Sequence, residues 1–123
     1  MKQDDCIFCK IVAGEIPSHT VYEDAHFIAF LDIRPLSPGH TLVIPKSHVR
    51  FVWNVPQIGN YFEVVQKIAH ALQKTTGTEE IYSKVIGEEV PHAHVWVFAN
   101  PDTAQGDKHD FEKNAATLRA ALQ

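Results

Sequence analysis

The sequence has little of what marks a nucleic-acid-binding, membrane or secreted protein. No run of basic residues is longer than two, and 11 Lys and Arg stand against 15 Asp and Glu. Because binding to a polyphosphate backbone depends on clustered basic side chains, we expect no nucleic acid among the partners. No apolar stretch approaches the roughly 20 residues of a membrane span, and the polar start does not resemble a signal peptide. The sequence therefore predicts a soluble, cytoplasmic protein without a membrane partner.

Low-complexity linkers and internal repeats are also missing. The 123 residues suit one domain over 1–123, and a chain of this length can bury a core without disulfides. Hydrophobic residues make up 45% and charged residues 21%, which is the composition of a globular chain and not of a disordered one.

The order of the expected elements is that of an α+β domain. Apolar residues at helical spacing predict three helices, over residues 6–12, 55–75 and 110–122. Runs of β-branched and aromatic residues predict five strands, over residues 21–23, 26–31, 40–45, 81–86 and 92–98. Asp4 or Asp5 is expected to cap the first helix. Short connections favour a mainly antiparallel five-stranded sheet with one long helix and short terminal helices.

Residues 91–98 read PHAHVWVF and place two histidines on one strand. Side chains alternate across a strand, so His92, His94 and Trp96 share one face while small apolar residues between them face the core. Neighbouring imidazoles on that face lie about 6–7 Å apart, close enough to contact one ligand or metal. Such a pair also arises by chance, so the pattern alone leaves both interpretations open.

The two cysteines, Cys6 and Cys9, are separated by only two residues. This spacing is too short for a normal structural disulfide of a secreted scaffold. In a reducing compartment it is typical of metal binding or redox chemistry. A thioredoxin-like role is the weaker alternative, because no βαβ unit follows the pair.

Residues 32–48 (DIRPLSPGHTLVIPKSH) form the most specific block of the chain. With residues 6–11 (CIFCKI) and the two strand histidines, this block resembles the histidine triad (HIT) family of nucleotide hydrolases and transferases, above all its zinc-containing bacterial branch. The resemblance covers residues 5–98. It implies a HIT-like α+β homodimer whose sheets join across the dimer. It also implies cleavage of purine nucleoside monophosphate derivatives, such as phosphoramidates or acyl-nucleotides, at the α-phosphate.

The resemblance assigns roles to individual residues around the expected nucleotide. His94 matches the nucleophile, a neutral imidazole that would form a nucleotidyl-histidine for water to hydrolyse. Asp32 matches the carboxylate that binds the ribose, although an aspartate here could equally cap its loop. His40 either supports the site or is a satisfied structural histidine, and His19 is expected to be a solvated or partly buried surface residue. The apolar walls around the base match four residues that could equally be plain core: Phe8, Ile11, Phe30 and Ile33.

The zinc ligands of that branch match Cys6, Cys9, His48 and His92. Two thiolates and two imidazoles suit tetrahedral zinc, and four protein ligands leave no position for water, so this zinc would be structural. His92 also belongs to the catalytic pattern. Without the resemblance, two reduced cysteines beside two unrelated histidines would be the simpler interpretation.

Two positions depart from the family pattern. Trp96 stands where the third histidine is expected, and an indole can donate a hydrogen bond but is not a useful acid. Loss of a general acid typically costs on the order of 10²–10⁴ in rate, least for leaving groups that need little protonation. Glu89 replaces a phosphate-contacting serine, where its charge repels phosphate unless this shortened turn keeps it in solvent. These departures leave a second interpretation open, a zinc-stabilised nucleotide-binding or regulatory module with weak or lost catalysis.

Overall fold

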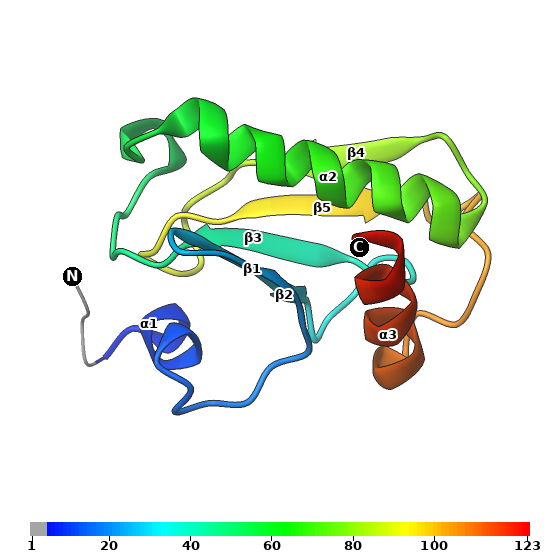
Figure 1. Ribbon diagram of the computed structural model, residues 1–123, viewed down its shortest axis with the longest axis horizontal. Helices are drawn as coiled ribbons and strands as arrows, with labels where there is room; N and C mark the ends of the chain where they lie inside the picture. The colour runs from blue at the N-terminus through cyan, green and yellow to red at the C-terminus, as the bar shows by residue number, and fades with distance from the viewer. Residues whose placement is uncertain (1–4) are drawn as a thin grey trace.

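The computed structural model describes residues 5–123 as one five-stranded sheet with helices on both faces (Figure 1). The strand order is β1-β2-β3-β5-β4, and every pairing is antiparallel. The strands are β1 Thr20–Glu23, β2 Phe27–Leu31, β3 Thr41–Pro45, β4 Ile81–Lys84 and β5 Val95–Ala99. The helices are α1 Ile7–Val12, α2 Ile58–Thr76 and α3 Phe111–Ala121, with a 3-10 turn at Val52–Asn54. The expected α+β class and antiparallel sheet are confirmed.

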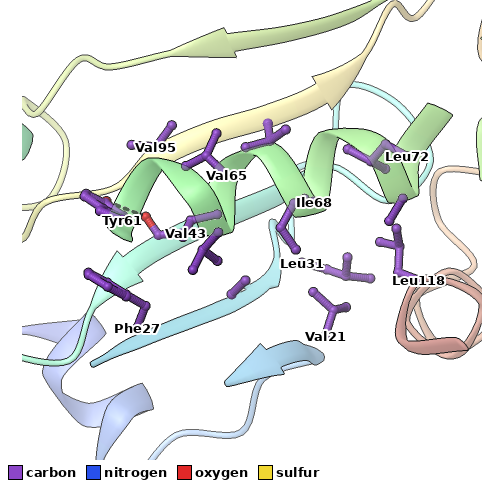
Figure 2. Close-up of a cluster of buried hydrophobic side chains, with 14 of the residues drawn as sticks. Val21, Phe27, Leu31, Val43, Tyr61, Val65, Ile68, Leu72, Val95 and Leu118 are labelled. Carbon is purple, nitrogen blue, oxygen red and sulfur yellow. Dashed lines mark hydrogen bonds between the residues drawn. The ribbon is translucent and has the colours of Figure 1, made fainter. Parts of the chain in front are cut away.

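The sheet sorts its side chains between two hydrophobic clusters by simple alternation. Val95 and Val97 of β5 belong to the large cluster under α2, whereas Trp96 packs against the smaller cluster on the side of α1. The same alternation holds on β2, where Ala29 faces α2 and Phe30 faces α1. Figure 2 shows the α2 side, where the helix lies along the sheet and its apolar side chains point at the strands. The sheet thus separates the large hydrophobic core under α2 from the smaller cluster on the side of α1.

One hydrogen bond fastens the long helix to the middle of the sheet. The Tyr61 hydroxyl donates to the Val43 carbonyl over 2.6 Å, the dashed line in Figure 2. Tyr61 is fully buried, and this burial raises the pKa of its phenol. The bond therefore lies in a region without water to replace it, and it helps to hold α2 against β3.

The loop that leads into β3 requires a glycine for two reasons. Gly39 has φ +80°, a left-handed conformation that side chains disfavour. A Cβ there would also lie 2.9 Å from Leu72 Cδ2 and 3.1 Å from Leu118 Cδ1. The close approach brings this loop against α2 and α3, and the loop carries Asp32 at its other end.

Three local expectations are corrected by the structure. The cap of α1 is Cys6, whose Sγ accepts a hydrogen bond from the Cys9 amide over 3.4 Å, so Asp5 does not cap it and Asp4 lies outside the described residues. Regular pairing of β5 begins at Val95, because the residues before it bend. The helix α2 starts after a 3-10 turn that the apolar periodicity did not reveal.

In the described part of the chain, no helix is both long and apolar enough to cross a bilayer.

Candidate functional site

A cavity of about 500 Å³ lies on the α1 side of the sheet. This size is within the range of small-molecule sites, and the lining is mainly apolar with a few polar groups. Four expected wall residues line it: Phe8, Ile11, Phe30 and Ile33. The other cavity residues named from the sequence also line it: Asp32, Glu89, His94 and Trp96. The fold therefore gathers residues from α1, β2, β5 and two loops around one space.

Within this cavity, His94 has a fixed ring orientation and tautomer. Its Nδ1 lies 2.8 Å from the His92 carbonyl, which can only accept, so Nδ1 carries the proton. In the neutral ring, Nε2 then keeps its lone pair, and no described residue forms a hydrogen bond with that atom. The Phe8 ring packs edge-on against the imidazole at 5.2 Å. The arrangement presents a basic nitrogen on a side chain that cannot easily rotate.

Asp32 lies at the rim of the same cavity, immediately after β2. Its Oδ1 accepts a hydrogen bond from the Arg34 amide over 2.8 Å, so the loop-capping role considered for it is real. The other carboxylate oxygen, Oδ2, is not used in that turn and lies 3.7 Å from His40 Nε2. The Asp32 side chain is 18% exposed, so its free oxygen can still meet a ligand.

His40 supports this rim from beneath. Its Nδ1 accepts a hydrogen bond from the Leu36 amide over 3.1 Å, so in the neutral ring the proton is on Nε2, facing Asp32. Burial lowers the pKa of His40 to about 4, against the opposing attraction of the Asp32 carboxylate and with a smaller contribution from the Lys84 ammonium. The ring is therefore neutral at pH 7 and orients the loop without adding a charge.

The four expected metal ligands come together beside the cavity. Cys6, Cys9, His48 and His92 each offer one atom, and these atoms all lie within 4.8 Å of one another. His92 Nδ1 lies 3.4 Å from Cys6 Sγ and 3.5 Å from Cys9 Sγ. His48 Nδ1 lies 3.3 Å from Cys9 Sγ. The two thiols are not joined in a disulfide, so both sulfurs can act as ligands.

These separations fit a tetrahedral zinc ion. Zn–S bonds of about 2.3 Å and Zn–N bonds of about 2.0–2.1 Å place neighbouring sulfur and nitrogen ligands roughly 3.6 Å apart. His92 Nε2 donates to the Pro45 carbonyl over 2.8 Å, which fixes the tautomer and leaves Nδ1 as the ligand atom. Burial lowers the pKa of His92 to about 4, so the ring is neutral as a metal ligand must be. The donor chemistry and the geometry of these residues therefore suit zinc.

The structure separates two groups of residues that the sequence treated together. His92 is turned into the ligand cluster and does not line the cavity, whereas His94 and Trp96 do. Glu89 is exposed and still lines the cavity, so the turn that carries it does not take it away from the site. The buried indole Nε1 of Trp96 has no hydrogen-bond partner among the described residues.

Three polar residues line the cavity that the sequence did not place there: Ser18, His19 and Arg34. His19 is half-buried, as one of its two expected states allowed, and its ring stacks on Phe111 of α3 at 5.5 Å. Ser18 and His19 follow Pro17 in the connection between α1 and β1. No local pattern in the chain brings that connection to the cavity, so only the tertiary arrangement reveals these residues.

Comparison with known proteins agrees with this arrangement. The HIT domain model matches residues 13–103 of the chain. The chain belongs to the histidine triad (HIT) family. Among curated HIT relatives, Protein hit of Bacillus subtilis is 41% identical over 111 residues, covering 85% of this chain and 75% of the relative. The adenosine 5'-monophosphoramidase HNT1 of Candida albicans is 35% identical over 112 residues, covering 82% of this chain and 74% of the relative.

Solved HIT structures share the fold over almost the whole chain. A Hit-like protein from Bartonella henselae aligns with TM-score 0.85 and 35% identity, covering 98% of this chain and 99% of that one. A Zn-bound histidine triad family protein from Mycobacterium smegmatis aligns with TM-score 0.76 and 33% identity, covering 96% and 93% of the two chains. The HIT fold of this chain thus occurs with zinc in one of its structural relatives.

Proposed function

We propose that this HIT protein hydrolyses nucleoside monophosphate derivatives at the α-phosphorus, with His94 as nucleophile. The observation that carries the proposal is the hydrogen bond from His94 Nδ1 to the His92 carbonyl, which leaves Nε2 unprotonated in a ligand-sized cavity. The Candida albicans relative is named as an adenosine 5'-monophosphoramidase, which supports the same class of substrate. Phosphoramidates and acyl-nucleotides of purine nucleosides are the substrates we expect.

In the proposed reaction the cavity residues divide the work. The apolar walls formed by Phe8, Ile11, Phe30 and Ile33 hold the purine base. The free Oδ2 of Asp32 accepts hydrogen bonds from the ribose hydroxyls. His94 Nε2 attacks phosphorus, the bond to the leaving group breaks, and water then hydrolyses the nucleotidyl-histidine. Positioning of the phosphate against a fixed nitrogen supplies much of the rate enhancement.

We also propose that Cys6, Cys9, His48 and His92 hold a structural zinc ion. Such an ion, when bound, ties α1 to the loop after β3 and to the segment before β5, and it offers no open position to substrate. His92 links this site to the reaction through its backbone, since its carbonyl accepts the hydrogen bond that His94 Nδ1 donates. In this proposal His92 acts on catalysis by positioning His94.

The test compares adenosine 5'-phosphoramidate hydrolysis by the wild type and by His94→Ala. We expect the variant to lose at least about 10³-fold in kcat, because no other group in the chain replaces a lost nucleophile. Acid-quenched wild-type reactions should contain the chain with one added AMP, and the adduct should map to His94 by peptide mass spectrometry. Equal turnover in the two proteins, or steady turnover with the adduct on another residue, contradicts the proposal.

A second function is favoured by Trp96 and Glu89, which place an indole and a carboxylate in the cavity. Under this alternative the chain binds nucleotide and regulates a partner without efficient catalysis. Tight AMP binding by calorimetry, with no turnover in the wild type and none restored by Trp96→His, would select it. Measurable wild-type turnover that depends on His94 would reject it.

A homodimer is the assembly we propose, joined at the free edge of the sheet. β4 is an edge strand, whereas the opposite edge strand, β1, is contacted by α3. An unpaired edge offers its backbone groups to another strand, and Tyr82 on β4 is 43% exposed. Light scattering coupled to gel filtration should give twice the mass of 13.8 kDa, and Tyr82→Glu should shift the protein towards monomer. A monomeric wild type at high micromolar concentration contradicts this assembly.

A further inference from the structure

A lysine lies beside the cavity in a position that the proposed reaction has not used. β4 pairs with β5 so that Lys84 stands directly opposite Trp96. Residues directly opposite each other in an antiparallel pair project from the same face, which here is the cavity face. The Lys84 ammonium lies 5.3 Å from the centre of the Trp96 ring and 6.0 Å from that of Phe98. The indole that lines the cavity thus carries a positive charge on its surface.

This ammonium has no carboxylate partner within 4.0 Å in the part of the chain that the structure describes. In residues 5–123, the ion pair within 4.0 Å joins Lys46 to Glu23, and Asp32 faces the neutral His40 ring, so no described carboxylate pairs with Lys84. Lys84 is exposed, so its flexible stem can turn the ammonium towards an anion that enters beside Trp96. Its charge acts on the groups packed behind Trp96, since it helps to lower the pKa of His40, whose ring lies 5.3 Å from the Trp96 ring. A cation with no acidic partner at a cavity edge is a candidate anion contact.

The Trp96 indole at the cavity wall cannot act as an acid towards a leaving group. The Trp96 indole has a single N–H, which donates but does not release its proton at ordinary pH. That N–H is buried and has no partner among the described residues. A leaving group beside Trp96 therefore meets a positive charge but no acid. An amine or alkoxide needs a proton to depart, whereas a carboxylate or sulfate departs as a stable anion.

We propose that Lys84 and Trp96 form the subsite for the departing group and select acid anhydrides of nucleotides, whose leaving group departs as an anion. The inference rests on the proposed function. When His94 Nε2 forms its bond to phosphorus, the bond from phosphorus to the anhydride oxygen breaks and its electron pair stays on that oxygen. Water later forms the new P–O bond, the P–N bond breaks, and one proton passes to solvent. The Lys84 ammonium stabilises the departing anion and remains protonated throughout.

The experiment measures kcat/KM for adenosine 5'-phosphosulfate and for adenosine 5'-phosphoramidate. The proteins are the wild type, Lys84→Gln, Lys84→Arg and the control Lys74→Gln, an exposed lysine of α2. We expect Lys84→Gln to lower kcat/KM for the phosphosulfate about tenfold, as for the loss of one charge-assisted contact, and to change the phosphoramidate value less than twofold. Lys84→Arg should keep at least half of the phosphosulfate value, and Lys74→Gln should match the wild type.

Equal effects of Lys84→Gln on the two substrates, or no effect on either, overturn the subsite. Hydrolysis of neither substrate by the wild type means that the proposed function fails, and the subsite is then decided by calorimetry. In that case adenosine 5'-phosphosulfate must bind the wild type several-fold more tightly than Lys84→Gln, while AMP binds both proteins alike. Equal affinities for the phosphosulfate reject the subsite independently of catalysis.

Discussion

His92 and His94 lie two residues apart and bind their protons on opposite ring nitrogens. His92 donates from Nε2 to the Pro45 carbonyl over 2.8 Å, and His94 donates from Nδ1 to the His92 carbonyl over 2.8 Å. His92 therefore directs Nδ1 at the thiols, and His94 keeps Nε2 free beside the cavity. Because the second bond uses the backbone of the first residue, a disturbance at the ligand cluster reaches the proposed nucleophile through one peptide unit.

Loss of a thiolate ligand should remove the metal and loosen the cavity. We expect about one zinc per chain in the wild type purified without added zinc, and less than about a tenth of that in Cys9→Ser. The melting temperature should fall by about 10 °C or more, because a structural zinc contributes several kcal/mol. Metal analysis and calorimetry measure both effects, with the exposed His70→Ala as control. Equal zinc content in Cys9→Ser and the wild type argues against these ligands.

Replacement of Asp32 by Asn should weaken substrate binding more than chemistry. Asn retains an oxygen for the Arg34 amide, so the loop keeps its shape, and the variant loses only the charge offered to the ribose. We expect KM for adenosine phosphoramidate to rise about tenfold while kcat changes less than threefold. The same comparison with a 2',3'-dideoxy substrate should show little difference between the proteins. An equal rise in KM for that substrate indicates that Asp32 acts on the loop and not on the hydroxyls.

Introduction of His at position 96 should supply the missing acid. We expect Trp96→His to raise kcat for adenosine phosphoramidate at least about tenfold, within the effect of a positioned general acid. The rate for adenosine 5'-phosphosulfate should change much less, since sulfate needs no proton. Trp96→Phe is the matched control, because it removes the indole without adding an acid. Equal rates for Trp96→His and Trp96→Phe would show that the rate rises because the smaller side chain leaves more room in the cavity, and not because the new histidine transfers a proton.

Acidification should destabilise the protein through His40. The pKa of this buried ring is about 4 in the folded chain and 6.5 in the unfolded chain, so between these values only the unfolded state binds the proton. The free energy of unfolding is unaffected above pH 6.5 and falls as the pH drops, by about 2 kcal/mol at pH 5. Urea titrations from pH 7.5 to 5 should show a steeper loss for the wild type than for His40→Gln. Parallel curves contradict a neutral buried ring.

Substitution of Gly39 by Ala should destabilise the fold by about 2 kcal/mol or more. The added Cβ meets Leu72 and Leu118 at close range and occupies a left-handed conformation. Gly59 in α2 is the matched control, because a Cβ there meets nothing within 4 Å. We expect Gly59→Ala to leave stability unchanged or raise it by up to about 1 kcal/mol. Chemical denaturation of both variants checks the contrast, and similar losses for the two exclude a specific role for Gly39.

The sequence predicted the features that depend on local periodicity. The alternation of Val95 and Val97 with Trp96 assigned the two faces of β5 correctly, because successive side chains of a strand point to opposite faces. The long helix was expected to end near residue 75, and α2 ends at Thr76, where Gly77 follows with a left-handed φ of 72°. These outcomes follow from backbone geometry, which is the same in every protein.

The features that depend on tertiary distance were harder to predict. The Cys6 thiol caps α1 in place of an aspartate because the same sulfur is turned towards Cys9 and His92, which the capping preference cannot register. Ser18, His19 and Arg34 reach the cavity only because loops from different parts of the chain fold over it. The position of Lys84 beside the cavity follows from its cross-strand pairing with Trp96, and the two residues are twelve positions apart in the chain.

In strand β5, alternate side chains serve two different purposes. One set of positions packs into the core under α2, and the other set faces the cavity. Deleting a single residue within it would exchange the two sets, turning valines into the cavity and the indole into the core. A substitution in this strand therefore changes one side chain on one face, whereas an insertion or a deletion changes both faces. The segment 86–91 lies outside the ladder and escapes that constraint, so a change in its length would alter the cavity lining at Glu89 and Val90 without exchanging the two faces of the sheet.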